Sequence, residues 1–105
     1  MAVLPQPTDE DLDLSTVLRA LSDPTRRQIL RALVRGPRRC GSFELPIAKS
    51  TVSHHFKVLR EAGLIEVEVQ GNARTATLRR DELEARFPGL LAVTGILGGS
   101  GTPSQ

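Results

Sequence analysis

Aromatic residues, cysteines and long apolar runs are scarce in this 105-residue sequence, which has no tryptophan, no tyrosine, three phenylalanines and one cysteine, Cys40. A single cysteine excludes a framework of disulfides within the chain. No apolar run approaches the length that crosses a membrane, and the N-terminus, M-A-V-L-P-Q-P, lacks the basic and apolar regions of a signal peptide. We therefore expect a cytoplasmic protein without a membrane segment.

Positive charge is concentrated in the middle third of the chain, although the net charge is only +2. Residues 24–60 carry nine bases and one acid, whereas residues 1–23 carry five acids and one base, and residues 61–105 carry six acids and four bases. Single arginines are usually only solvated, but a localised basic face is typical of proteins that bind polyanions. Proteins that bind single strands usually stack bases on aromatic side chains, which are rare here, so the composition favours double-stranded DNA.

The segment from Ser50 to Gly63 has the pattern of an amphipathic helix. Ser50 is a suitable N-cap, and Gly63 tolerates the left-handed conformation that ends a helix. Val52, Phe56 and Leu59 form one apolar stripe. The opposite face is polar and mostly neutral or basic, which suits the recognition helix of a helix-turn-helix in a DNA groove. The DNA-contacting residues expected on this helix are Ser50, Thr51, Ser53, His54 and Lys57.

Two helices are predicted before it. Residues 9–22 follow a possible cap, Thr8, and carry an apolar stripe of Leu14, Val17, Leu18 and Leu21. Residues 24–35 form the second predicted helix, because Asp23 can cap it and Pro24 suits the first helical position.

Residues 38–49 should contain the first helix of the helix-turn-helix. Pro46 cannot occupy a helix interior, so the predicted helix is short, around residues 41–45. Phe43, Leu45 and Ile47 are expected to pack beneath the recognition helix.

The pattern changes to a period of two after Gly63. Ile65, Val67 and Val69 alternate with polar residues, and Gly71-Asn72 is a typical two-residue hairpin loop. This loop pairs Gln70 with Ala73 and, at the far end, Ile65 with Leu78. A hairpin after a recognition helix is a wing, and the residues expected to contact the phosphate backbone or the minor groove are Gln70, Asn72 and Arg74.

A last helical stretch is predicted from Asp81, with a break or kink at Pro88-Gly89. Its end is strongly apolar through Leu90, Leu91, Val93, Ile96 and Leu97. We expect this segment to form a dimer interface with the first helix, while the alternative is that it folds back on its own core. The predicted organisation is a flexible N-terminus (1–8), one mainly α-helical winged helix-turn-helix domain with a small β-hairpin (9–97), and a flexible tail (98–105).

Two sequence blocks resemble the ArsR/SmtB family of bacterial winged-helix repressors: L-R-A-L-S-D-P-T-R-R-Q-I-L-R-A-L (18–33) and S-T-V-S-H-H-F-K-V-L-R-E-A-G-L-I (50–65). The similarity extends from about Leu12 to Leu97. It implies a homodimer that binds an operator and releases it in response to a signal, which in many members is a metal ion and in others redox state or a small molecule. By position it assigns DNA reading to Thr51, Ser53, His54 and Lys57 and, on the wing, to Arg74, and it includes a recurrent Ser-x-His pair, Ser53 and His55.

The sequence departs from the metal-binding members of that family. Members that bind thiophilic metals carry paired cysteines in the first helix of the helix-turn-helix, where this sequence reads R-R-C-G-S-F-E-L with one cysteine. Members that bind zinc between their last helices supply Asp and His, and the last predicted helix here has no histidine. His54 and His55 lie about 100° apart on a helix, so we expect His54 to face DNA and His55 to make a structural hydrogen bond. One His and one Cys are too few for a tetrahedral zinc site, so we expect no metal or other cofactor.

Cys40 follows Arg38 and Arg39, and neighbouring cations can lower a thiol pKa. A redox sensor is therefore one hypothesis for Cys40, and an inert, partly buried thiol is the alternative we favour. No nucleophile elbow, phosphate loop or H-E-x-x-H motif occurs, so we do not expect an enzyme.

The sequence as a whole predicts a homodimeric, sequence-specific transcriptional regulator that represses by binding a pseudo-palindromic operator in double-stranded DNA. The alternative is a winged-helix module for protein interactions, whose apolar C-terminal segment binds a partner and whose DNA contact is incidental.

Overall fold

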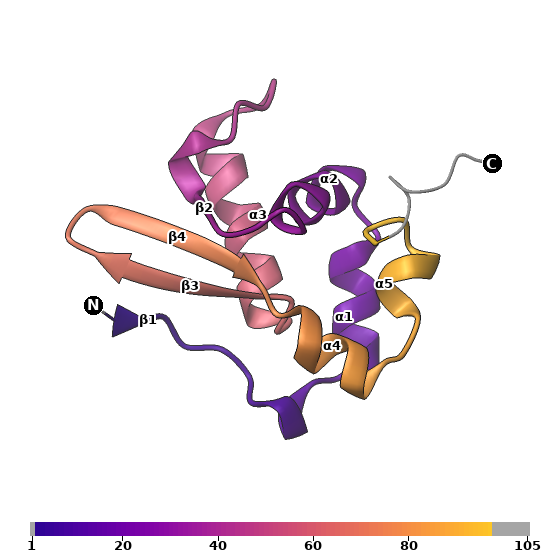
Figure 1. Ribbon diagram of the computed structural model, residues 1–105. Helices are drawn as coiled ribbons and strands as arrows, with labels where there is room; N and C mark the ends of the chain where they lie inside the picture. The colour runs from indigo at the N-terminus through magenta and orange to yellow at the C-terminus, as the bar shows by residue number, and fades with distance from the viewer. Residues whose placement is uncertain (1, 98–105) are drawn as a thin grey trace.

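The computed structural model describes residues 2–97, in which helices surround a hydrophobic core and a small antiparallel sheet extends from one side (Figure 1). The α-helices are α1 (Leu14–Leu21), α2 (Pro24–Leu33), α3 (Lys49–Glu61), α4 (Arg80–Arg86) and α5 (Leu90–Val93). The strands are β1 (Ala2–Val3), β2 (Arg38–Arg39), β3 (Ile65–Gln70) and β4 (Ala73–Leu78), and two 3-10 turns, η1 and η2, cover Asp9–Asp11 and Cys40–Ser42. The predicted winged helix-turn-helix architecture is thereby confirmed.

The first predicted helix is wrong in extent, because residues 9–22 do not form one helix. Asp13 adopts an extended backbone and caps α1, accepting a 2.9 Å hydrogen bond from the Thr16 amide. Leu12, just before it, turns into the core. Thr8 does not cap a helix through its side chain, because its hydroxyl bonds to the Asp11 carboxylate at 3.0 Å instead.

The start of α2 agrees with the sequence prediction. Asp23 Oδ1 accepts hydrogen bonds from the amides of Thr25 (2.7 Å) and Arg26 (3.1 Å), and Pro24 occupies the first turn. The helix ends at Leu33, two residues earlier than predicted.

The helix predicted at residues 41–45 is not formed. Arg38 and Arg39 pair with Ala76 and Thr75 of β4, so the preceding chain is held as a strand, and only a 3-10 turn follows. Pro46 then prevents a longer helix from forming before α3. Within the described chain, residues 43–47 make no backbone-to-backbone hydrogen bond. We refer to residues 43–47 as the extended segment.

The N-terminus was expected to be flexible, and the structure pairs residues 2–4 of it with the sheet. Strand β1 pairs with β3 (Ala2 with Val69 and Val3 with Glu68), giving the sheet order β1-β3-β4-β2. The Leu4 amide donates to the Val67 carbonyl at 2.9 Å. The expected flexible tail, residues 98–105, lies outside the described residues.

Helix α3 begins two residues earlier than the predicted cap implies. Its N-cap is Ala48, so Ser50 lies inside the first turn and the predicted capping role of Ser50 is wrong. The end agrees with the prediction: Gly63 has a φ of +86°, and the amides of Gly63 and Leu64 donate to the carbonyls of Arg60 and Leu59, which is a Schellman motif.

The hairpin and the C-terminal break follow the predicted pattern. All six β3–β4 pairs, from Ile65 with Leu78 to Gln70 with Ala73, have the predicted register. Gly71 alone in the loop has a positive φ, +60°, which fits a type II′ turn. Pro88-Gly89 separates α4 from α5.

Candidate nucleic-acid interface

The outward face of α3 is available for contact along its whole first half. Each of the five side chains predicted to contact DNA on this helix is exposed: Ser50, Thr51, Ser53, His54 and Lys57. The apolar stripe predicted behind them does pack inward, with Phe56 and Leu59 buried and Val52 half-buried. The face is therefore presented by a helix whose opposite side is fixed to the core.

The wing carries the remaining predicted contacts. Gln70, Asn72 and Arg74 are exposed at or near the loop of the β3–β4 hairpin, which projects from the helical body (Figure 1). The sheet beyond the loop is wider than a bare hairpin, because β1 and β2 pair with its two edges.

A cleft of about 1000 Å³ separates α3 from the wing and the extended segment. Ser53 and Lys57 line it from α3, and Arg74 lines it from β4, so the structure brings these three predicted residues together. The other predicted contacts, Ser50, Thr51, His54, Gln70 and Asn72, do not line it.

Two further cations line the cleft and were not singled out as site residues from the sequence. Lys49 opens α3 and Arg60 lies near its end, where the Arg60 guanidinium donates to the Pro5 carbonyl. Their membership in the basic segment of residues 24–60 was the signal that could have identified them. The cleft is therefore strongly cationic along its rim.

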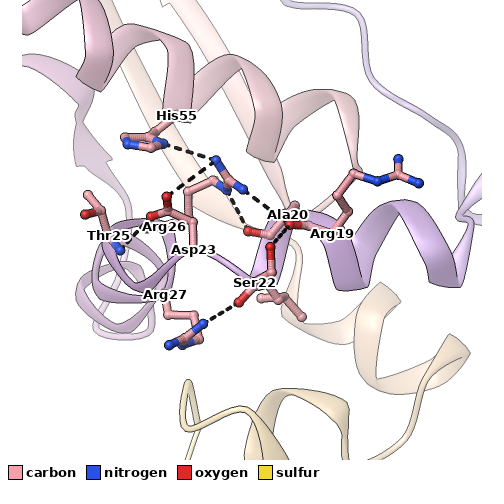
Figure 2. A network of polar contacts seen from close by, with 9 residues as sticks. Arg19, Ala20, Ser22, Asp23, Thr25, Arg26, Arg27 and His55 are labelled. Carbon is pink, nitrogen blue, oxygen red and sulfur yellow. Dashed lines mark hydrogen bonds and ion pairs between the residues drawn. The ribbon is translucent and has the colours of Figure 1, made fainter.

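His55 holds α3 to the two helices before it, as expected of a structural histidine. Its side chain is buried, with 8% exposure, and Nδ1 lies 3.3 Å from Arg26 Nη1. A guanidinium has donors only, so Nδ1 is the acceptor. Arg26 also donates to the carbonyls of Ala20 (2.6 Å) and Arg19 (3.2 Å), so one guanidinium joins α1, α2 and α3 (Figure 2).

Two aspartates at the starts of the first two helices have lowered pKa values. Burial opposes ionisation of Asp23, but hydrogen bonds from the Arg26 and Thr25 amides outweigh it and hold the Asp23 pKa below 3.8. Asp13 is exposed, and the hydrogen bonds from the Thr16 amide and hydroxyl lower its pKa. Both caps are therefore strongest as carboxylates.

The environment of Cys40 differs from the one expected of a redox sensor. Burial raises the pKa of the Cys40 thiol and outweighs the opposing effect of Arg74. Arg38, which was expected to favour the thiolate, instead stacks on Phe43, with its guanidinium carbon 4.3 Å from the ring centroid. These features favour the inert alternative.

The structure adds two observations on metal binding and membrane association. Among residues 2–97, no three His, Cys, Asp or Glu side chains gather closely enough to hold a metal ion. None of the helices in the same range has the length and apolar character needed to cross a bilayer.

Apolar residues of the predicted dimer interface divide into two groups. Leu91 and Ile96 are buried in the chain's own core, as the fold-back alternative required. Leu14 and Leu18 on α1, each 45% exposed, and Val93, 80% exposed, remain open to solvent. Helices α1 and α5 lie on the side of the molecule away from the wing (Figure 1).

Comparison with known proteins agrees with this architecture. The family described as bacterial regulatory protein, arsR family, matches residues 23–67. An uncharacterised HTH-type transcriptional regulator of Bacillus subtilis (strain 168), YceK, is 35% identical over 86 residues, which span 78% of this chain and 86% of the relative. The arsenical resistance operon repressor of Staphylococcus xylosus is 35% identical over 74 residues, which cover 69% of this chain and 71% of that protein.

A solved structure supports the same relationship. An ArsR-like transcriptional regulator from Rhodococcus sp. RHA1 superposes with a TM-score of 0.63 and 29% identity, over 76% of this chain and 77% of that one. The sequence matches, the shared fold and the exposed α3 face together identify a DNA-binding transcriptional regulator, not an enzyme. The chain belongs to the ArsR family of transcriptional regulators.

Proposed function

We propose that the protein represses transcription as a homodimer on a pseudo-palindromic operator, with α3 of each copy in the major groove and each wing against the flanking backbone or minor groove. The observation that carries this proposal is the exposed polar face of α3 facing a cationic wing residue across one cleft. Lys57 and Arg74 are the proposed phosphate contacts, and Thr51, Ser53 and His54 are the proposed base contacts. Ser50, Gln70 and Asn72 complete the proposed DNA surface.

The proposed dimer uses α1 together with the end of α5. Leu14 and Leu18 lie one helical turn apart, so their side chains share one face of α1. Exposing these leucines does not stabilise a monomer. In a two-fold symmetric dimer, the same two leucines of both copies would be buried at the interface. Two copies of α3 would then meet successive major grooves, and half-sites should lie about 34–36 Å apart.

Fluorescence anisotropy on the DNA upstream of the protein's own gene tests the DNA contacts. Lys57→Ala and Arg74→Ala should each weaken binding to all sequences and reduce the salt slope by about 1, because each variant leaves one phosphate without its cation. Ser53→Ala and His54→Ala should instead change the preferred bases. If all four variants lowered affinity uniformly, this division of roles would be wrong.

Sedimentation of matched variants tests the dimer. Leu18→Glu should weaken dimerisation by at least about tenfold, because the interface loses burial of the exposed part of two leucines, about 0.7–1.4 kcal/mol each, and gains two charges. Val3→Glu is the matched control, since Val3 is 48% exposed on β1 and lies outside the proposed interface. Equal dimerisation of the two variants would contradict the α1 interface, and specific DNA binding by a monomeric Leu18→Glu would contradict the need for a dimer.

A further inference from the structure

The cleft between α3, the wing and the extended segment has an apolar floor whose residues are not among the proposed DNA contacts. We propose that it binds a small amphipathic carboxylate, an apolar chain or ring carrying one acid group, and that this ligand competes directly with DNA. The competition rests on the proposed DNA surface, whereas binding of the ligand itself does not.

The floor of the cleft is apolar and comes from four parts of the chain. Phe43 and Leu45 belong to the extended segment, whereas the other lining side chains come from the N-terminus, α3 and β3: Leu4, Val52, Phe56 and Val67. The rings of Phe43 and Phe56 meet edge to face, with centroids 5.3 Å apart. A cavity of about 1000 Å³ with such a lining is at the upper end of the range for small-molecule sites.

The rim of the cleft supplies uncompensated positive charge. Lys49, Lys57 and Arg74 line it, and none of them forms an ion pair or a hydrogen bond through its side chain with any of residues 2–97. Glu44 is the single acid among the lining residues. Apolar floor and cationic rim together match a molecule with an apolar body and one anionic end, whereas a neutral or cationic ligand would leave the rim unpaired.

The extended segment lines the cleft at the place where the sequence predicted a helix. Within the described chain, residues 43–47 contribute no backbone-to-backbone hydrogen bonds and are fixed mainly by side chains. Arg38 and Phe56 hold Phe43 from two sides. The segment can therefore shift to enclose a ligand without breaking a hydrogen-bonded element.

Occupancy of the cleft excludes DNA because the two ligands share residues. Ser53 and Lys57 line the cleft and also belong to the proposed DNA face, and Arg74 reaches the cleft from the wing. A carboxylate bound to Lys57 and Arg74 takes both cations away from the phosphates. The proposed dimer has two such clefts, and both must be empty for DNA to bind. Simple competition then requires that the apparent dissociation constant for DNA rises more steeply than linearly with ligand concentration, without a plateau.

Binding to the cleft is measured first without DNA, using 8-anilinonaphthalene-1-sulfonate as the fluorescent amphipathic anion. The wild-type protein contains no tryptophan or tyrosine, and exciting the dye in its own long-wavelength band avoids the tryptophan of the Leu45→Trp variant introduced below. Octanoate should displace the dye at constant ionic strength, and 1-octanol at the same concentration should displace less of it. Leu45→Trp, which fills the floor, and Ile47→Asp, which places an acid at the mouth, should both lower dye and octanoate affinity at least tenfold.

The variants distinguish binding of the dye in the cleft from nonspecific binding elsewhere on the protein. Ile47 is 37% exposed, so Ile47→Asp should remain folded even where Leu45→Trp does not, and circular dichroism checks both. Val3→Asp is the matched control outside the cleft and should bind the dye as the wild type does. Equal dye binding by wild type and Ile47→Asp, or equal displacement by octanol and octanoate, would overturn the proposal.

Competition with DNA is then measured by anisotropy. At ten times the dissociation constant of octanoate, the apparent DNA dissociation constant should rise about 120-fold for wild type and Val3→Asp, which is an elevenfold effect at each of the two clefts of the dimer. Ile47→Asp should show no more than about a fourfold rise, because octanoate binds each of its two clefts at least tenfold more weakly. A plateau, or the same release from Ile47→Asp, would overturn direct competition. Absence of DNA binding would instead contradict the proposed function, while the dye titration would still decide the cleft.

Discussion

Replacing Arg26 by alanine should destabilise the protein more than the removal of any other basic side chain on α2. Arg26 lies in the network of Figure 2, and its side chain is only 13% exposed. It donates to the carbonyls of Ala20 and Arg19 near the end of α1, and the Arg19 carbonyl also accepts from the amide and the hydroxyl of the cap residue Ser22. It also satisfies Nδ1 of His55. Arg26→Ala removes all three hydrogen bonds.

The magnitude follows from the geometry of these three bonds. A hydrogen bond involving a charged group contributes about 1.5–3 kcal/mol when it is short, which describes the 2.6 Å bond to Ala20. The bonds of 3.2 Å and 3.3 Å are longer, and water can replace the one to the exposed Arg19, so each contributes less. We expect a decrease of about 2–3 kcal/mol in the free energy of unfolding, or a fall in Tm of roughly 10–20 °C.

The assay is thermal and urea unfolding followed by circular dichroism at one protein concentration. Arg31→Ala is the matched control, because the Arg31 side chain is exposed on the same helix and has no hydrogen-bond partner among residues 2–97. Its free energy of unfolding should change by less than about 0.5 kcal/mol. A double-mutant cycle with His55→Ala should give a coupling of about 1 kcal/mol with Arg26→Ala. If Arg26→Ala unfolded within error of Arg31→Ala, the network would not stabilise the fold.

Three further changes test the local structure. Gly63→Ala should lower the free energy of unfolding by more than about 1 kcal/mol, because the φ of Gly63 is +86° and a Cβ there would clash with Leu12 Cδ2. The control is Gly41→Ala, where a Cβ meets open space, and this variant should unfold in urea like the wild type. The Asp23 pKa is lower in the folded than in the unfolded state, so the stabilisation that Asp23 provides is present above about pH 4 and is lost as the pH falls below that value. Asp23→Asn should flatten this part of a curve of unfolding free energy against pH, and an unchanged curve would contradict the capping role of Asp23. Cys40 should react with iodoacetamide at pH 7.5 more slowly than a free cysteine, because burial raises its thiol pKa, and a faster reaction would restore the redox hypothesis.

Local signals allowed much of the fold to be predicted from the sequence. The Gly71-Asn72 turn sets the register of the hairpin, and a period of two fixes which residues face inward, so every pair could be derived. Asp23-Pro24 and Gly63 mark helix ends through backbone chemistry that depends on no distant residue. The exposure of the eight predicted DNA contacts follows from the same periodicity.

Elements that depend on long-range pairing were not predictable in the same way. Residues 2–8 contain little that specifies a strand, and β1 exists because the free edge of β3 accepts Ala2 and Val3. Arg79 adds a tertiary contact by donating to the Pro7 carbonyl at 2.7 Å and to Asp9 at 3.0 Å. The strand at Arg38–Arg39 likewise arises from β4, and it displaced the helix predicted just after it. The cleft was missed for the same reason, because it forms between segments that are distant in sequence.

The two faces of α3 imply two separate routes by which its DNA contacts can be changed. The inner face is attached through His55 and Arg26 to α1, where the proposed dimer interface lies. The cleft uses Val52, Ser53, Phe56 and Lys57 of α3 but no residue of α1 or α2. A ligand in the cleft therefore has no contact through which it could favour the monomer over the dimer, and without such a difference in contacts it cannot shift that equilibrium. Release of DNA by such a ligand should leave the dimer intact, whereas loosening the Arg26 network should disturb α3 and the dimer interface together.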